Sequence, residues 1–175
     1  MGMAVALNPR RDALELLRSE HRAIDSLLER YEQLAPDDQE RVTAAIDVAR
    51  EFTYHAILES EVVLPAIEAV IEAQCDADDL RTAIEIARLE IDMANALIER
   101  SEALHEDAVR LDAVLRLLIP LVRRHLSAEN ANLLPILCNP HVDSRQVAIR
   151  ISEHRIAVER AVFDVDESFC EVDDD

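Results

Sequence analysis

The sequence predicts an all-α protein, an up-down-up-down four-helix bundle followed by one additional C-terminal helix. Its single glycine, Gly2, precedes any expected folded segment, so β-hairpins and glycine-rich phosphate loops lack the residue they need. Half of the 175 residues are hydrophobic, and Ala, Leu, Ile, Glu and Arg abound, as in helices with one buried face. We expect one domain, with the bundle over about residues 9–138 and the extra helix over about 143–169.

The helix boundaries follow from caps and breaks. Asn8-Pro9 predicts the first start, because a capping side chain precedes a proline at the first helical position, and that helix should end near Pro36. The next three helices are expected over about 39–72, 79–104 and 107–138, separated by breaks that contain Asp, and Asp143 or Ser144 should cap the fifth. Apolar residues recur at helical spacing, as in the first stripe: Leu14, Leu17, Ile24, Leu28 and Tyr31.

The charge balance argues against two classes of partner. There are 18 basic and 37 acidic residues, a net charge of −19, which repels nucleic acid and anionic membranes. The apolar stretches are shorter than the ~20 residues of a membrane-spanning helix, and the N-terminus lacks the apolar core of a signal peptide. The three cysteines form no CxxC pair and read as free thiols, which favours a cytoplasmic location.

Three of the expected helices carry polar residues inside their apolar stripes. His21 interrupts the first stripe, His55 and Glu59 share the apolar face of the second helix, and His125 and Glu129 do the same on the fourth. A lone histidine on such a face is commonly a hydrogen-bonded core residue. An ionised carboxylate buried without a counter-charge, however, is strongly unfavourable. Two His-x-x-x-Glu pairs on separate helices therefore indicate a bound cation.

The chain also repeats itself at an offset of 70 residues. The segment HAILESEVVLP, which begins at His55, corresponds to HLSAENANLLP, which begins at His125. Outside these motifs, Leu28 corresponds to Ile98 at the same offset. The sequence therefore predicts a duplicated helical hairpin.

The polar residues should meet halfway along the bundle. With a rise of ~1.5 Å per residue, they fall within about two helical turns of one layer. Imidazole and carboxylate together suit non-haem iron, with manganese or zinc as alternatives. We expect one or two metal ions, held by His21, His55, Glu59, His125 and Glu129.

These residues resemble the pattern of the hemerythrin-like, HHE cation-binding domain family: a His on the first helix, HxxxE on the second, a His on the third and HxxxE on the fourth. The matches are Glu20-His21 and the two HxxxE pairs, each followed by Leu-Pro, and the resemblance covers about residues 11–138. It implies a four-helix bundle that holds a di-iron centre bridged by two carboxylates. It also implies roles in oxygen binding, in sensing of oxygen or iron, or in repair of nitric-oxide damage.

One position departs from the family pattern. The residue that corresponds to His21 at the 70-residue offset is Ile91, so the third-helix pair reads Glu90-Ile91. Three interpretations follow: a di-metal site with a weakened second ion, a single ion held by His21, His55 and the two glutamates, or a site that has lost its metal.

A residue of the fifth helix is a candidate for the missing ligand. The segment Ser152-Glu153-His154-Arg155 repeats Ser19-Glu20-His21-Arg22 letter for letter, and His154 lies on the apolar stripe of that helix. Because a fifth helix normally packs outside a four-helix core, a partly buried structural histidine is the competing interpretation.

Two functions of different classes fit the sequence. The first is a metal-binding hemerythrin-like protein that binds or senses dioxygen, iron or nitric oxide. The second is a metal-depleted helical bundle that acts as a protein-interaction or regulatory module, alone or as a homo-oligomer. No nucleophile–base pair with an orienting third group is visible, so the sequence does not predict an enzyme.

Overall fold

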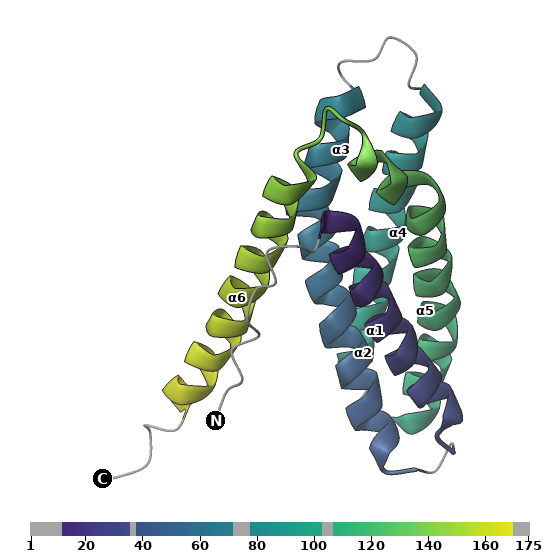
Figure 1. Ribbon diagram of the computed structural model, residues 1–175. Coiled ribbons are helices and arrows are strands. Elements are labelled where there is room, and N and C mark those ends of the chain that lie inside the picture. The colour runs from purple at the N-terminus through teal and green to yellow at the C-terminus, as the bar shows by residue number, and fades with distance from the viewer. Residues whose placement is uncertain (1–11, 36–37, 72–77, 103–106, 170–175) are drawn as a thin grey trace.

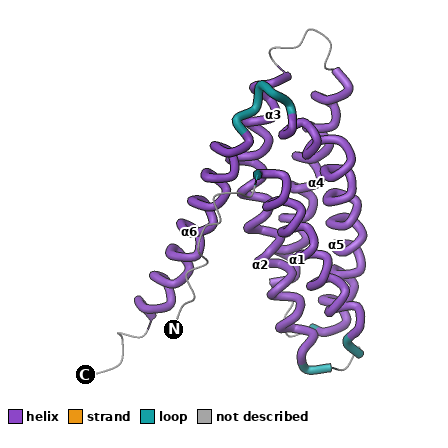
Figure 2. Tube along the Cα trace, viewed as in Figure 1, coloured by secondary structure: helices purple, strands orange, loops and turns teal. Residues whose placement is uncertain are grey.

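Helices form all the regular structure in the computed structural model, which describes residues 12–35, 38–71, 78–102 and 107–169 (Figure 1). Among these residues there is no strand, as the sequence predicts (Figure 2). In chain order, the elements are α1 (Ala13–Gln33), α2 (Glu40–Leu58), the π-helical η1 (Glu59–Val63), α3 (Leu64–Ile71), α4 (Asp78–Glu102), α5 (Ala108–Ala128), the π-helical η2 (Glu129–Leu133), the 3₁₀-helical η3 (Leu134–Cys138) and α6 (Ser144–Phe169).

Three of the helices, α1, α5 and α6, begin at an aspartate whose side chain caps them. Asp12, Asp107 and Asp143 each accept a hydrogen bond from the backbone N–H three residues later, at 2.8, 3.1 and 2.9 Å. Asp143 is therefore the cap of α6 among the two candidates. The start predicted at Asn8-Pro9 lies outside the described residues.

The two helices that carry the His-x-x-x-Glu pairs change from α- to π-helical at the glutamate. The sequence predicts ordinary helices here, but η1 begins at Glu59 and η2 at Glu129. A proline follows each glutamate by six residues, and proline has no N–H to continue the α-helical ladder. The Glu61 carbonyl, which would pair with residue 65 in an α-helix, instead accepts a hydrogen bond from Arg150 of α6 at 3.1 Å.

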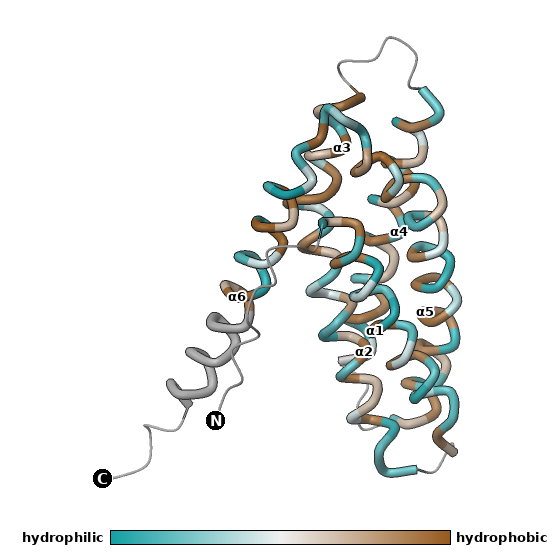
Figure 3. Tube along the Cα trace, in the orientation of Figure 1, coloured by the Kyte–Doolittle hydropathy of each residue, from teal (hydrophilic) through white to brown (hydrophobic). Residues whose placement is uncertain are grey.

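The bundle interior consists of two apolar clusters, with the predicted polar residues outside both. Apolar and polar residues alternate along each helix of the bundle (Figure 3). The first cluster lies around Leu28, Phe52 and Ile91, and the second around Leu17, Leu58 and Ile84. Both clusters draw on α1, α2 and α4, so the helices bury apolar surface on either side of the polar residues.

Helix α6 packs against one side of the bundle, over α1, α2 and η1. Its first half buries Val147, Ala148 and Ile151 in the second apolar cluster, and its second half diverges from α2 (Figure 1). In the part of the chain that the structure describes, no helix is long and apolar enough to cross a membrane.

Two leucines test whether the first apolar cluster stabilises the fold. Leu28 is completely buried and Leu117 is 63% exposed. We expect Leu28→Ala to lower the free energy of unfolding by about 2–5 kcal/mol, because it leaves a cavity, and Leu117→Ala to lower it by less than about 0.5 kcal/mol. Urea denaturation followed by circular dichroism measures both, and equal losses would contradict the packing described here.

Candidate metal centre

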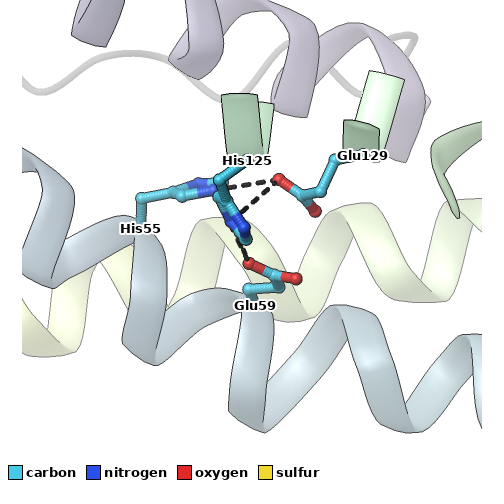
Figure 4. Close-up of side chains that lie close together, drawn as sticks. All are labelled: His55, Glu59, His125 and Glu129. Carbon is cyan, nitrogen blue, oxygen red and sulfur yellow. Dashed lines mark hydrogen bonds and ion pairs between the residues drawn. The ribbon is translucent and has the colours of Figure 1, made fainter. Parts of the chain in front are cut away.

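The two His-x-x-x-Glu pairs meet in the middle of the bundle. His55 and Glu59 come from α2 and η1, His125 and Glu129 from α5 and η2, and the four side chains point toward one another (Figure 4). One ligand atom of each lies within 4.8 Å of those of the other three, and all four residues are at most 1% exposed. The sequence therefore identified two pairs that share one buried site.

Both glutamates are contacted by imidazole nitrogens of the opposite helix. His55 Nε2 lies 3.1 Å from Glu129 Oε2 and 3.8 Å from Glu59 Oε2. His125 Nε2 lies 2.8 Å from Glu59 Oε2 and 3.6 Å from Glu129 Oε2. Each glutamate thus lies between the two imidazoles, and its shorter contact is to the imidazole from the other half of the repeat.

His21 of α1 lies at the edge of this cluster. Its Nε2 is 3.2 Å from Glu129 Oε2, and its ring packs edge-on against that of His55 at 5.0 Å between centroids. The side-chain amide of Asn130 donates to His21 Nδ1 at 2.9 Å and also to the carbonyl of Leu126. His21 therefore contacts the cluster mainly through Glu129.

Two further carboxylates lie behind the imidazoles. His125 Nδ1 is 3.2 Å from Glu90 Oε2, and His55 Nδ1 is 4.0 Å from Glu20 Oε2. Both glutamates are buried, at 5% and 7% exposed. A carboxylate near Nδ1 favours a proton on that nitrogen, so that Nε2 could offer its lone pair to a metal ion after releasing its own proton.

Without a metal, the imidazoles are the counter-charges of the central glutamates. Burial alone would lower the pKa of His55, but its hydrogen bond to Glu129 and the nearby Glu20 carboxylate raise that pKa to about 10. Burial also lowers the pKa of His125, but the hydrogen bond and charge of the Glu59 carboxylate outweigh burial, so the pKa of His125 is raised. Burial and the nearby charge of Glu129 raise the pKa of Glu59, whereas hydrogen bonds from His21 and His55 lower the pKa of Glu129 despite its burial.

The residues present fit a metal ion. Among the described residues, no group donates a hydrogen bond to Glu59 Oε1 or Glu129 Oε1, although both atoms are buried. Three imidazoles and two carboxylates converge here with no thiolate, a donor set that suits iron, manganese or zinc. These atoms would hold the ion, and Glu20 and Glu90 would orient two of its imidazole ligands.

The departure at position 91 has a direct structural counterpart. Ile91 is 5% exposed and belongs to the first apolar cluster, with Phe52 and Val122. Phe52 in turn contacts the rings of His55 and His125, at 5.9 and 5.8 Å between centroids. The first apolar cluster, to which Ile91 belongs, therefore borders the site through Phe52.

His154 lies on the outer side of η1, away from the cluster. Its Nε2 is 3.1 Å from Glu61 Oε2, and its ring is 6.1 Å from that of Tyr54. The cluster of four ligand residues does not include it. These contacts match the interpretation of His154 as a partly buried structural histidine.

Sequence reasoning missed the outer residues of the site. Glu20 and Glu90 are 70 residues apart, as are the two His-x-x-x-Glu pairs. The repeat therefore indicates that these two glutamates occupy equivalent places. Asn130 directly follows the candidate ligand Glu129, but its side-chain amide bonds to His21 of α1. No local sequence pattern indicates this contact. The contact between Arg155 and Glu20, at 3.7 Å, depends on how α6 packs and had no sequence signal.

A comparison with protein-family models places this sequence in a known family. The model described as the hemerythrin HHE cation-binding domain matches residues 12–137, which include α1 to α5 and both ligand pairs. Neither the curated proteins nor the solved structures gave a match. The family match covers most of the chain and agrees with the helical bundle and its buried His/Glu cluster. The chain belongs to the hemerythrin HHE cation-binding family.

Proposed function

We propose that this protein binds one iron ion in the middle of the bundle and uses it to sense dioxygen, nitric oxide or iron itself. The observation that carries the proposal is the buried cluster of His55, Glu59, His125 and Glu129, whose ligand atoms lie within 4.8 Å of one another. A bound non-haem iron would supply a redox-active centre that takes a small ligand. The exposed free thiol of Cys138 suits a reducing cytoplasm.

A single ion is the stoichiometry we favour. The four clustered side chains offer one ligand atom each to a common centre, and His21 lies beside them on the side of Glu129. Ile91, which corresponds to His21 at the 70-residue offset, belongs to the first apolar cluster and offers no ligand atom. With one iron, sensing is a better fit than oxygen carriage by an iron pair.

The alternative is a metal-free bundle that acts as an interaction module. One observation favours it: His55, with a pKa near 10, can supply positive charge to the glutamates without a metal. The two proposals differ in metal content and in their response to pH.

Replacing a central glutamate should remove the metal. We expect Glu59→Gln to reduce metal content from about one ion per chain to nearly none, because the amide keeps the size but loses the charge. Its control is Glu61→Gln, two residues later in η1, where the side chain is 64% exposed. Elemental analysis after expression in iron-replete cells measures both and identifies the metal. Wild-type metal content in Glu59→Gln would mean that the assigned site is wrong.

Restoring the third-helix histidine should add a metal. We expect Ile91→His to raise metal content toward two ions per chain, because a further imidazole then faces the two carboxylates. With chelator, the variant should be about 1–3 kcal/mol less stable than wild type and should regain stability when iron is added. Ile91→Gln is the control, since it adds a polar side chain without an imidazole. Unchanged stoichiometry, with destabilisation under both conditions, would mean that the isoleucine at position 91 is not what limits the site to one ion.

The pH dependence of stability separates the metal-free protein from the loaded one. The folded pKa of His55 is about 10 against an ordinary 6.5, so its contribution is complete below pH 6.5 and is lost as pH rises toward 10. The metal-free protein should therefore lose stability, on the order of a few kcal/mol, over that range. The loaded protein should instead lose its metal as pH falls below ~6.5, because protons compete for the imidazoles.

Urea denaturation in EDTA and in iron, from pH 5 to pH 10, tests this contrast. His141→Gln, at an exposed position outside the bundle, should follow the wild-type profile. Identical profiles with and without chelator would argue for the metal-free alternative.

A further inference from the structure

We propose that Arg155 of α6 is a positioning residue for the metal centre, so that metal binding and docking of the C-terminal helix strengthen each other. The inference rests on the proposed function, because it concerns regulation of the same site. It starts from the two carboxylates behind the ligand imidazoles.

Glu20 has one oxygen toward the metal centre and one toward α6. Its Oε2 lies 4.0 Å from His55 Nδ1, and its Oε1 lies 3.7 Å from a guanidinium nitrogen of Arg155. The carboxylate is 7% exposed, whereas the Arg155 side chain is 44% exposed. A chain of contacts thus runs from the molecular surface, through one buried carboxylate, to a candidate ligand.

The other half of the repeat contains a similar chain of contacts, but its arginine comes from a helix of the bundle. Glu90 Oε2 lies 3.2 Å from His125 Nδ1, and its Oε1 lies 2.8 Å from Arg124 Nε. Arg124 is the direct neighbour of His125 on α5, so this half carries its own arginine.

At the position equivalent to Arg124, 70 residues earlier, the first half carries Tyr54. The guanidinium of Arg155 lies over the Tyr54 ring, 5.1 Å from its centroid, and also 3.4 Å from Glu51 Oε1. Helix α6 therefore supplies from outside the bundle the cation that the second half has on its own helix.

This arrangement connects the two events energetically. An arginine that holds Glu20 keeps the carboxylate directed at His55 Nδ1, which fixes the ring and leaves Nε2 for the metal. A metal bound at Nε2 would in turn increase the attraction between the Nδ1–H and the Glu20 carboxylate 4.0 Å away. Because the effect of one binding event on another is reciprocal, whatever strengthens metal binding through Arg155 must also strengthen α6 docking.

The test compares two arginines of α6 with Co²⁺ as a spectroscopically visible probe. Arg155→Met keeps the apolar stem over Tyr54 and removes the charge. Arg150→Met removes another α6 arginine, which donates to the Glu61 carbonyl, without changing a contact described for Glu20. We expect Arg155→Met to weaken Co²⁺ binding about tenfold and to shift the Co²⁺ absorption bands, and Arg150→Met to change neither.

Two further measurements exclude a purely local packing effect. In a Glu20→Gln background, Arg155→Met should cause no additional loss of affinity, because the carboxylate it acts through is gone. Co²⁺ should slow hydrogen exchange of the backbone amides of residues 147–158 in the wild type and not in Arg155→Met.

The outcomes separate the two proposals. Absence of Co²⁺ binding in the wild type would overturn the proposed function. Three results would support the metal site but overturn the role of Arg155. They are a Co²⁺ affinity of Arg155→Met equal to that of the wild type, equal losses of affinity in both arginine variants, and additive effects of Arg155→Met and Glu20→Gln.

Discussion

Two carboxylates buried in the middle of a helical bundle impose the constraint on which the rest of this structure depends. Glu59 and Glu129 are almost inaccessible to water, and each requires positive charge nearby. The imidazoles of His55 and His125 lie across the bundle from the glutamates that they contact most closely, so neutralising either glutamate requires both halves of the chain. The same nitrogens can carry a proton or face a metal ion. Occupancy of the site is therefore a competition between these two cations.

The two halves of the internal repeat differ around this constraint. Both halves contain a His-x-x-x-Glu pair and a further carboxylate near its imidazole. Position 91, which corresponds to His21, is an isoleucine in the apolar core. Position 54, which corresponds to Arg124, is a tyrosine, and α6 supplies the arginine that lies over its ring. The two halves thus share a ligand pattern but depend on different surroundings.

Local sequence patterns were sufficient for the fold and for the central residues. Helical spacing and the predicted breaks placed most helices within a few residues, and Asp143 is one of the two caps predicted for the last helix. In each His-x-x-x-Glu pair the two side chains lie on the same face because they are one helical turn apart. The π-helical segments were missed because helical periodicity does not report where an extra residue enters a turn, although Pro65 and Pro135 marked the places. The contact of Arg155 with Glu20 joins residues far apart in the chain, and only the packing of α6 brings them together. The position of His154 likewise followed from helix packing and not from its copied motif.

The division of the interior into two apolar clusters has a consequence for folding cooperativity. Each cluster draws on helices from both ends of the chain, and the connection between them passes through a layer of charged side chains. The hydrophobic contacts within each cluster do not depend directly on pH, whereas the layer between the clusters is stable only while its charges are balanced. A cation in that layer, whether a proton on an imidazole or a metal ion, preserves the charge balance there. We therefore expect the charge balance of this layer to influence whether the two ends of the bundle unfold together or separately.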